Sequence, residues 1–295
     1  MTEPDLFGIG PGYAGPDADA AFSRRGSAPC ALGLDFGTAS VRALVVETRT
    51  GRERGSAVAD YRHGVIEAAL PGAAERLPHD WALQHPGDWI EAIEPAVHQA
   101  VAAAGVPREA IVGIGVDFTS CTVLPVDASG APLCLDARWA KRPHAWVKLW
   151  KHHAAQPQAD RINAAAEARG EAFLADYGGR TSSEWLAAKA LQVLEEDPEV
   201  YAAAASIVEG GDWVVGELTG VRVRNACGAG YKGFWSRARG FPSREFFGAL
   251  APGFESLPQK LGGEIVPPGR AAGGLTPAMA ACLGLVPGTA VAAAI

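Results

Sequence analysis

The chain of 295 residues is long enough to bury a large core, as one big domain or two modest ones. Its residues are 48% hydrophobic and 20% charged, which is typical of a globular protein, and its net charge of −7 argues against nucleic acid or an acidic membrane surface as a partner. No apolar stretch has the length of a membrane span. The five cysteines are odd in number and lack CxxC spacing, so neither a disulfide framework nor a cysteine-based zinc site is expected, and a reducing, cytoplasmic setting is favoured.

Residues 1–29 are expected to form a flexible N-terminal tail. The segment is rich in Gly, Pro, Ala and Asp and lacks the apolar core of a secretory signal. A single domain is expected to occupy residues 30–295. The chain stops inside an apolar strand that is expected from Ala290 onward, which favours a domain that continues beyond Ile295.

The first part of this domain predicts an α/β fold. Strands are expected at residues 31–36, 41–48, 53–60, 110–117 and 121–126. A helix is expected from Pro86 to Ala104, because proline stands in its first turn, apolar residues line one face and Gly105 follows. Three antiparallel strands, a helix and a further strand are the opening order of a ribonuclease H-like, actin-type ATPase half.

Residues 137–240 are expected to be mostly helical. One predicted helix carries an apolar stripe made of Trp146, Leu149, Trp150 and His153. The pattern Thr181–Glu184 is a capping box, which predicts a helix directly after it. Asp212 is expected to cap a short helix, and Thr276 to begin another near the end of the chain.

The most informative segment for function is the turn between the first two strands. Asp35 enters a tight turn built on Gly37, hydroxyls follow at Thr38 and Ser40, and Arg42 begins the next strand. Free backbone N–H groups and hydroxyl donors suit a phosphate chain, and a Mg²⁺ ion between Asp35 and the phosphates would offset their repulsion. The segment lacks the ending of a Walker loop. The alternative is ordinary hairpin chemistry, since Asp, Gly and Thr are common in turns.

Two later segments present polar groups without an obvious structural role. Residues 115–122 follow a predicted strand, and Ser120 lies where ligands usually bind in α/β sheets. Residues 224–235 read as a Gly-rich irregular loop that presents Lys232 beside aromatic residues, which suits a polar, hydroxylated ligand. A Ser/Thr-rich turn and an exposed loop lysine are the alternative interpretations.

Taken together, six segments resemble the FGGY family of carbohydrate kinases, and within it the ribulokinase branch. They are residues 35–42, 113–127, 149–155, 178–185, 209–213 and 224–235. The first is shared widely among sugar kinases of this superfamily. The second and the last are narrower and point to the ribulokinase branch. The resemblance runs from about Ala31 to Ile295 in the family order.

The resemblance implies a ribonuclease H-like (actin/hexokinase-type) N-terminal domain with a largely helical sugar-binding insertion. A second actin-like domain would follow, with ATP in the cleft between the two. Asp35 would meet Mg²⁺, while Gly37, Thr38 and Ser40 would line the phosphates and Arg42 would lie near the γ-phosphate. Ala39 stands where many members have a polar residue, which removes one phosphate donor.

The implied reaction is ATP-dependent phosphorylation of L-ribulose, or a related pentulose or pentitol, at its terminal hydroxyl. Ser120 and Lys232 would bind the sugar. The family's catalytic base is an aspartate that would come just after Ile295, so the chain alone is expected to bind sugar better than it reacts. The implied partner is a small sugar, with no nucleic acid or membrane, and a homodimer is compatible with the resemblance.

Two alternatives stay open at this point. The chain would otherwise be a non-catalytic sugar-binding domain with an inherited kinase surface, or a family member that acts on a different pentulose. An actin- or Hsp70-like ATPase half ranks last, because Lys232 and the segment 117–121 have no evident role in it.

Overall fold

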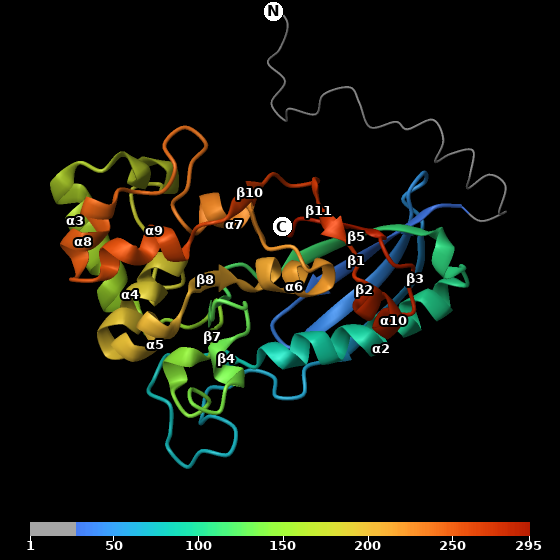
Figure 1. Cartoon of the computed structure of the whole chain (residues 1–295), viewed down its shortest axis with the longest axis horizontal. Helices are drawn as coiled ribbons and strands as arrows, with labels where there is room; N and C mark the ends of the chain where they lie inside the picture. The colour runs from blue at the N-terminus through green and yellow to red at the C-terminus, as the bar shows by residue number, and fades with distance from the viewer. Residues whose placement is uncertain (1–27) are drawn as a thin grey trace, which may run out of the picture.

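The computed structural model describes residues 28–295 and contains two bodies of secondary structure (Figure 1). One is a twisted sheet with helices packed on it, and the other is a mostly helical lobe beside it. The first 27 residues of the expected tail lie outside the described residues. Within residues 28–295, no helix has both the length and the apolar character needed to cross a membrane.

A six-stranded sheet with the order β11-β12-β5-β1-β2-β3 forms the first body. Its strands are β1 (Cys30–Phe36), β2 (Ser40–Glu47), β3 (Glu53–Asp60), β5 (Ile111–Phe118), β11 (Ala271–Gly274) and β12 (Ala290–Ala292). Neighbours among β1, β2 and β3 run antiparallel, whereas β5 is parallel to both β1 and β12. This order and these directions are those of the predicted ribonuclease H-like α/β fold.

Three helices pack on one face of this sheet: α2 (Pro86–Ala104), α6 (Gly210–Thr219) and α10 (Pro277–Leu283). Successive side chains of a strand point to opposite faces, so every second residue enters this core. Leu32, Leu34 and Phe36 of β1 are fully buried there, with Trp89 of α2. The residues between them lie on the other face, and Asp35 is exposed on it.

The helical lobe has its own apolar core, in which Leu191, Phe246 and Phe247 are fully buried. Its helices are α3 (Gln156–Arg169), α4 (Leu186–Glu196), α5 (Pro198–Ala203), α7 (Ala226–Tyr231), α8 (Arg244–Leu250) and α9 (Leu257–Lys260). A small sheet of order β4-β7-β6-β8 borders the lobe. The remaining strands are β4 (Leu83–Gln84), β6 (Val123–Val126), β7 (Val147–Lys148), β8 (Ser206–Glu209), β9 (Val223–Asn225) and β10 (Glu264–Val266).

Elements with strong local signals lie where the sequence predicts them. Helix α2 has the expected bounds, and Gly105 ends it in the left-handed conformation, at φ 62°. Thr276 caps α10 by accepting a hydrogen bond from the backbone N–H of Met279 at 3.2 Å. The strands of the first meander match their predicted bounds to within a residue.

Four local predictions were wrong. The tryptophan stripe is not a helix, because Trp146 and Leu149 flank the short strand β7 and are buried on the border of the lobe. The expected capping box does not form, since Asn163 already accepts from the backbone N–H of Thr181 at 2.7 Å and α4 begins at Leu186 without a side-chain cap.

The other two errors concern the segments around α6 and α7. Asp212 is not an N-cap, because α6 begins at Gly210 and the Asp212 carboxylate instead accepts from the backbone N–H and side-chain amide of Asn225, at 2.8 and 2.7 Å. Residues 224–235 are not an irregular loop throughout. Asn225 caps the short helix α7 there.

The contact between β3 and α2 gives a stability prediction. A Cβ added at Gly55 would lie 2.6 Å from the carbonyl oxygen of Ala100 and 2.9 Å from the carbonyl carbon of Ala103, both in the α2 backbone. Gly55→Ala is therefore expected to lower the free energy of unfolding by about 1–3 kcal/mol, as overpacking does. Gly115→Ala is the control, because a Cβ there meets no atom within 4 Å. Equal urea midpoints for the two variants would contradict this packing.

Candidate functional site

Two carboxylates lie next to each other at the ends of parallel strands. Asp35 of β1 and Asp117 of β5 are register partners, and both are exposed. Asp117 was missed as a site residue. Asp117 lies in the segment 113–127 of the family resemblance, which could have pointed to it. Its position beside Asp35 depends on the pairing of β1 with β5, which joins residues far apart in the sequence.

Arg42 lies opposite Asp35 on β2, as register partners of an antiparallel pair. Its Nη1 is 3.9 Å from Oδ2 of Asp35, and the two side chains are 59% and 54% exposed. Such an exposed pair contributes little to stability. Because both side chains are more than half exposed, a charged ligand on this face can reach them.

The turn between β1 and β2 is held by hydrogen bonds from other elements. The N–H of Gly37 donates to the carbonyl of Ser40 at 2.9 Å, which closes the turn. The Gln84 side chain donates to the carbonyl of Thr38, and the N–H of Tyr61 donates to the carbonyl of Ala39, both at 2.8 Å. A fixed turn can present its remaining N–H groups without reorganising when a ligand binds.

The hydroxyl of Thr38 accepts a hydrogen bond from the indole N–H of Trp150 at 3.1 Å. The hydroxyl therefore keeps its own proton for donation. Trp150 comes from the segment after β7, so the helical lobe contacts this turn directly. This contact gives Trp150 a polar role in place of the apolar stripe expected from the sequence.

A cavity of about 310 Å³ lies between the sheet edge and the helical lobe. It is lined by Asp117, Phe118, Thr119, Ser120, Glu209, Gly211, Asn225, Cys227, Gly228, Tyr231, Lys232 and Ile295. Ser120 and Lys232, which the sequence suggested separately, share this cavity. Asp35, Gly37, Thr38, Ser40 and Arg42 are not in its lining. Asp117 lines the cavity and is the register partner of Asp35, so it connects the cavity residues with the residues of the β1–β2 turn.

Lys232 lies against an aromatic wall. Its Nζ is 4.1 Å from the ring centroid of Tyr231 and 5.1 Å from that of Trp185. Both distances are within the range of cation–π attraction. Tyr177 extends this wall, since its ring contacts that of Trp185 with centroids 5.1 Å apart. The wall holds the ammonium group at the cavity.

The loop that carries Ser120 is fixed by a buried lysine. Lys189 of α4 is fully buried, and its Nζ donates to the carbonyls of Cys121 and Leu149 at 2.5 and 2.8 Å. Cys121 has a positive φ of 64°, a conformation unusual for a residue with a side chain. Backbone strain held in place by neighbouring groups is a common feature of functional sites.

Glu209 is the most unusual group in the cavity. It is only 6% exposed, and its Oε1 has no hydrogen-bond partner in the described structure. Burial raises the pKa of Glu209 to about 8, although the Lys189 charge opposes the shift. The side chain is therefore mostly protonated at neutral pH and can donate as well as accept a hydrogen bond.

Two glycines allow Glu209 to reach this position. A Cβ at Gly210 would lie 2.6 Å from Cζ of Phe118, and one at Gly211 would lie 3.0 Å from Cβ of the same residue. Only glycine lets the start of α6 approach the end of β5 this closely. Residues 209–213 are one of the six segments of the family resemblance, but the sequence did not assign Glu209 to a site.

The titration of Glu209 gives a second stability prediction. Between about pH 5 and pH 8 the folded protein keeps this proton, whereas the unfolded chain releases it. The unfolded state then binds fewer protons, so the contribution of Glu209 to the free energy of unfolding falls as pH rises, by at most about 1.4 kcal/mol per pH unit.

Glu209→Gln cannot ionise, so it is expected to lose this dependence. Urea unfolding of both proteins at about pH 5.5 and about pH 7.5 measures the effect. The stability of the variant relative to the wild type should rise with pH. A difference that stays constant with pH would show that Glu209 is ionised in the folded protein throughout.

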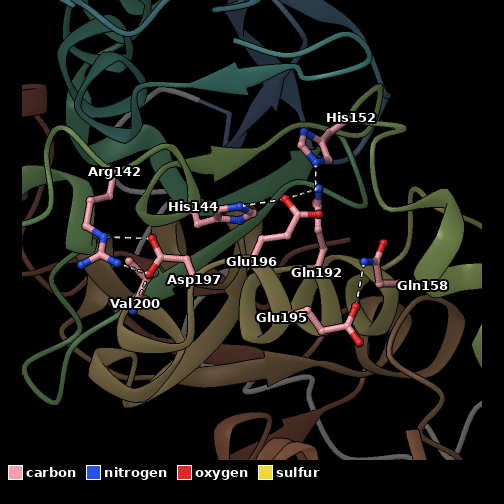
Figure 2. A network of polar contacts seen from close by, with 9 residues as sticks. All are labelled: Arg142, His144, His152, Gln158, Gln192, Glu195, Glu196, Asp197 and Val200. Atoms are coloured by element: carbon pink, nitrogen blue, oxygen red, sulfur yellow. Dashed lines mark hydrogen bonds and ion pairs between the residues drawn. The ribbon is translucent and has the colours of Figure 1, made fainter. Parts of the chain in front are cut away.

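Figure 2 shows a polar network of the lobe whose residues do not line this cavity. Arg142 pairs with Asp197, and the ring nitrogens of His144 and His152 contact Glu196 and Gln192, at 3.1 and 2.8 Å. Burial keeps the pKa of His144 low, at about 2. None of these residues lines the cavity. The network joins α4 and the start of α5 to the segments on both sides of β7.

Comparison with known proteins assigns the chain to a family. The family model for the N-terminal domain of the FGGY family of carbohydrate kinases matches residues 30–295. The chain therefore belongs to the FGGY family of carbohydrate kinases.

Its curated relatives include several ribulokinases. The ribulokinase of Mycolicibacterium smegmatis is 54% identical over 263 residues, which cover 88% of this chain and 46% of that protein. The ribulokinase of Geobacillus thermodenitrificans is 52% identical over 262 residues, with the same coverage. The chain thus spans about half the length of the curated relatives it matches.

Solved structures of sugar kinases share the fold. The xylulose kinase of Rhodospirillum rubrum aligns with a TM-score of 0.71 at 23% identity, over 90% of this chain and 48% of that one. The gluconate kinase of Lactobacillus acidophilus aligns with a TM-score of 0.69 at 15% identity, over 90% of this chain and 47% of that one. At these identities the similarity shows the fold alone, and it agrees with the predicted actin/hexokinase-like class.

Proposed function

We propose that this chain is the sugar-binding half of a ribulokinase, an enzyme that transfers the γ-phosphoryl group of ATP to the terminal hydroxyl of L-ribulose or a related pentulose. The observation that carries the proposal is the cavity that gathers Ser120, Glu209 and Lys232 beside Asp117, the neighbour of Asp35. A ketopentose offers several hydroxyls and a carbonyl, which match donors and acceptors of this kind.

The sugar site in this proposal has one charged donor and one neutral acid. The ammonium group of Lys232 donates to sugar oxygens. Glu209 supplies a buried hydrogen-bonding group that is otherwise unpaired, and Ser120 adds its hydroxyl. Because an unpaired buried polar group costs free energy, a hydroxyl that satisfies Glu209 contributes to affinity and to specificity for polyols.

The phosphate site lies at the turn of residues 37–40. Backbone N–H groups and the hydroxyls of Thr38 and Ser40 are the proposed donors to the phosphates, with Arg42 near the γ-phosphate. The carboxylates of Asp35 and Asp117 fit Mg²⁺, since both are exposed oxygen donors at one edge of the sheet. When bound, Mg²⁺ would neutralise charge on the phosphates.

In the proposed reaction, the terminal hydroxyl oxygen of the sugar attacks the γ-phosphorus, and the bond from that phosphorus to ADP breaks. The hydroxyl proton would go to a carboxylate base, the aspartate that we expect just after Ile295. Ile295 itself lines the cavity. This chain's residues orient the sugar and the phosphates, which is most of what phosphoryl transfer requires of a protein.

The setting proposed for this function is the cytoplasm, with a small sugar as the partner. The five cysteines are free thiols in the structure, which suits a reducing compartment. The net charge of −7 disfavours nucleic acid as a partner. The homodimer stays a prediction.

Calorimetric titration of the chain with L-ribulose tests the proposal. We expect saturable binding of one ketopentose per chain, with other pentuloses as comparison ligands and glucose as the negative control. Failure of every pentulose to bind would overturn the proposed function. Binding without any turnover in an extended chain would favour a non-catalytic sugar-binding domain.

A further inference from the structure

Two histidines and an aspartate converge beneath the phosphate turn, outside the site described above. His63 follows β3, while His85 and Asp88 lie at the start of α2. Nδ1 of His63 is 2.7 Å from Oδ1 of Asp88, and Nδ1 of His85 is 3.6 Å from the same oxygen. One ligand atom from each of the three residues lies within 4.8 Å of the other two.

We propose that His63, His85 and Asp88 form a binding site for a transition-metal ion, with Zn²⁺ as the expected metal. Two imidazole nitrogens and one carboxylate oxygen are a common zinc ligand set, whereas Mg²⁺ prefers oxygen ligands alone. Ligands at bonds of about 2.0–2.1 Å around a tetrahedral ion stand about 3.3 Å apart. The two distances from Oδ1 of Asp88, 2.7 Å to His63 and 3.6 Å to His85, lie on both sides of this value. Small shifts of the side chains would therefore bring the three ligand atoms into place.

One of the three proposed ligand atoms lacks a hydrogen-bond partner, which supports a missing ligand at this place. Nδ1 of His85 is buried and has no hydrogen-bond partner in the described structure. Such a group costs free energy unless something satisfies it. A metal ion bound at this nitrogen would also separate it from the Asp88 oxygen, which it faces without a hydrogen bond.

The surroundings already hold the three ligands in place. Asp88 is 2% exposed, and its Oδ2 accepts from the backbone N–H of His63 at 2.8 Å. Its Oδ1, which contacts Nδ1 of His63, is the oxygen that would bind the metal in place of that contact. The rings of His63 and His85 stack with centroids 4.6 Å apart. Outer contacts of this kind orient metal ligands. The histidine side chains are 29% and 23% exposed, so a water molecule has access to a fourth position.

The proposed site connects to the phosphate turn through its neighbours in the chain. Gln84 precedes His85 and binds the carbonyl of Thr38, and Tyr61, two residues before His63, binds the carbonyl of Ala39. A metal ion bound by His63, His85 and Asp88 would join the segment after β3 to the start of α2. It would therefore restrain the turn through Tyr61 and Gln84. This ion would be distinct from the Mg²⁺ proposed at Asp35 in ligand type and in place.

Zinc titration of the chelator-treated chain by calorimetry tests this inference. The experiment uses a Cys227→Ser background, because Cys227 is an exposed thiol that would compete for Zn²⁺. We expect one Zn²⁺ per chain, weakened at least about 10-fold in His63→Gln and in His85→Gln. His98→Gln is the matched control, because its ring contacts the carbonyl of Cys282 and not this cluster.

A second measurement keeps the test informative if a variant is less stable. Co²⁺ bound by the wild-type cluster should give the visible absorption of a four-coordinate site, and Zn²⁺ should abolish it. Hydrogen exchange of residues 37–40 should slow when Zn²⁺ binds. Absence of saturable binding, or binding that survives in both histidine variants, would show that the cluster is only hydrogen-bonded. Neither result depends on whether the chain binds a sugar.

Discussion

Replacing Lys232 with methionine is expected to weaken L-ribulose binding about 10- to 100-fold. Methionine keeps the length and the apolar stem of the side chain but removes the ammonium group at the cavity. Hydrogen bonds to charged groups contribute about 1.5–3 kcal/mol, which corresponds to this range. The fold should be little affected, because the Lys232 side chain is only partly buried and forms no ion pair within residues 28–295.

Calorimetric titration of wild type and variant with L-ribulose measures the effect. Lys141→Met is the matched control, since Lys141 is exposed and lies outside the cavity. The control should bind the sugar as the wild type does, and both variants should unfold at the wild-type urea midpoint. Unchanged binding in Lys232→Met would remove Lys232 from the proposed sugar site.

Asp35→Asn is expected to reduce ATP-dependent phosphorylation of L-ribulose at least about 100-fold, as the loss of one electrostatic group at a transferring phosphoryl typically does. The asparagine has nearly the same shape, but it lacks the negative charge that the proposed Mg²⁺ requires. Sugar binding should be unaffected, because Asp35 is not part of the cavity lining.

This prediction is measured as ADP release by the chain extended with the second half of the Mycolicibacterium smegmatis ribulokinase. Asp160→Asn serves as the control, because Asp160 lies on the exposed surface of α3. The kcat should fall in Asp35→Asn and stay unchanged in the control. Equal kcat values for the two variants would exclude Asp35 from the phosphate and metal site.

The local parts of the fold and the site could be predicted because their signals lie within a few residues. The hairpin of Asp35 and Arg42 follows from a strand, a glycine turn and a second strand. Helix α2 has a proline at its start and a glycine at its end, and both signals act locally.

The cavity could not be predicted in the same way, because it depends on long-range packing. It joins the end of β5, the start of α6 and the end of α7, and the meeting of these elements requires the parallel pairing of β5 with β1. The role of Glu209 depends on burial and on an unpaired oxygen, neither of which has a sequence signature.

The wrong predictions have a similar origin. Trp146 and Leu149 have helical spacing, but they flank a two-residue strand whose partners come from β4 and β6. The capping-box pattern at Thr181 gave way to a hydrogen bond that the backbone N–H of Thr181 donates to the side chain of Asn163 in α3. In both places, tertiary contacts outweighed the local preference.

L-Ribulose-dependent ADP release by the extended chain is the decisive measurement, because it requires the sugar cavity and the phosphate turn to act on one reaction. We expect turnover that needs both ATP and a ketopentose and that is lost in Asp35→Asn. Release of ADP that is indifferent to every pentulose, from an extended chain that is folded, would contradict it.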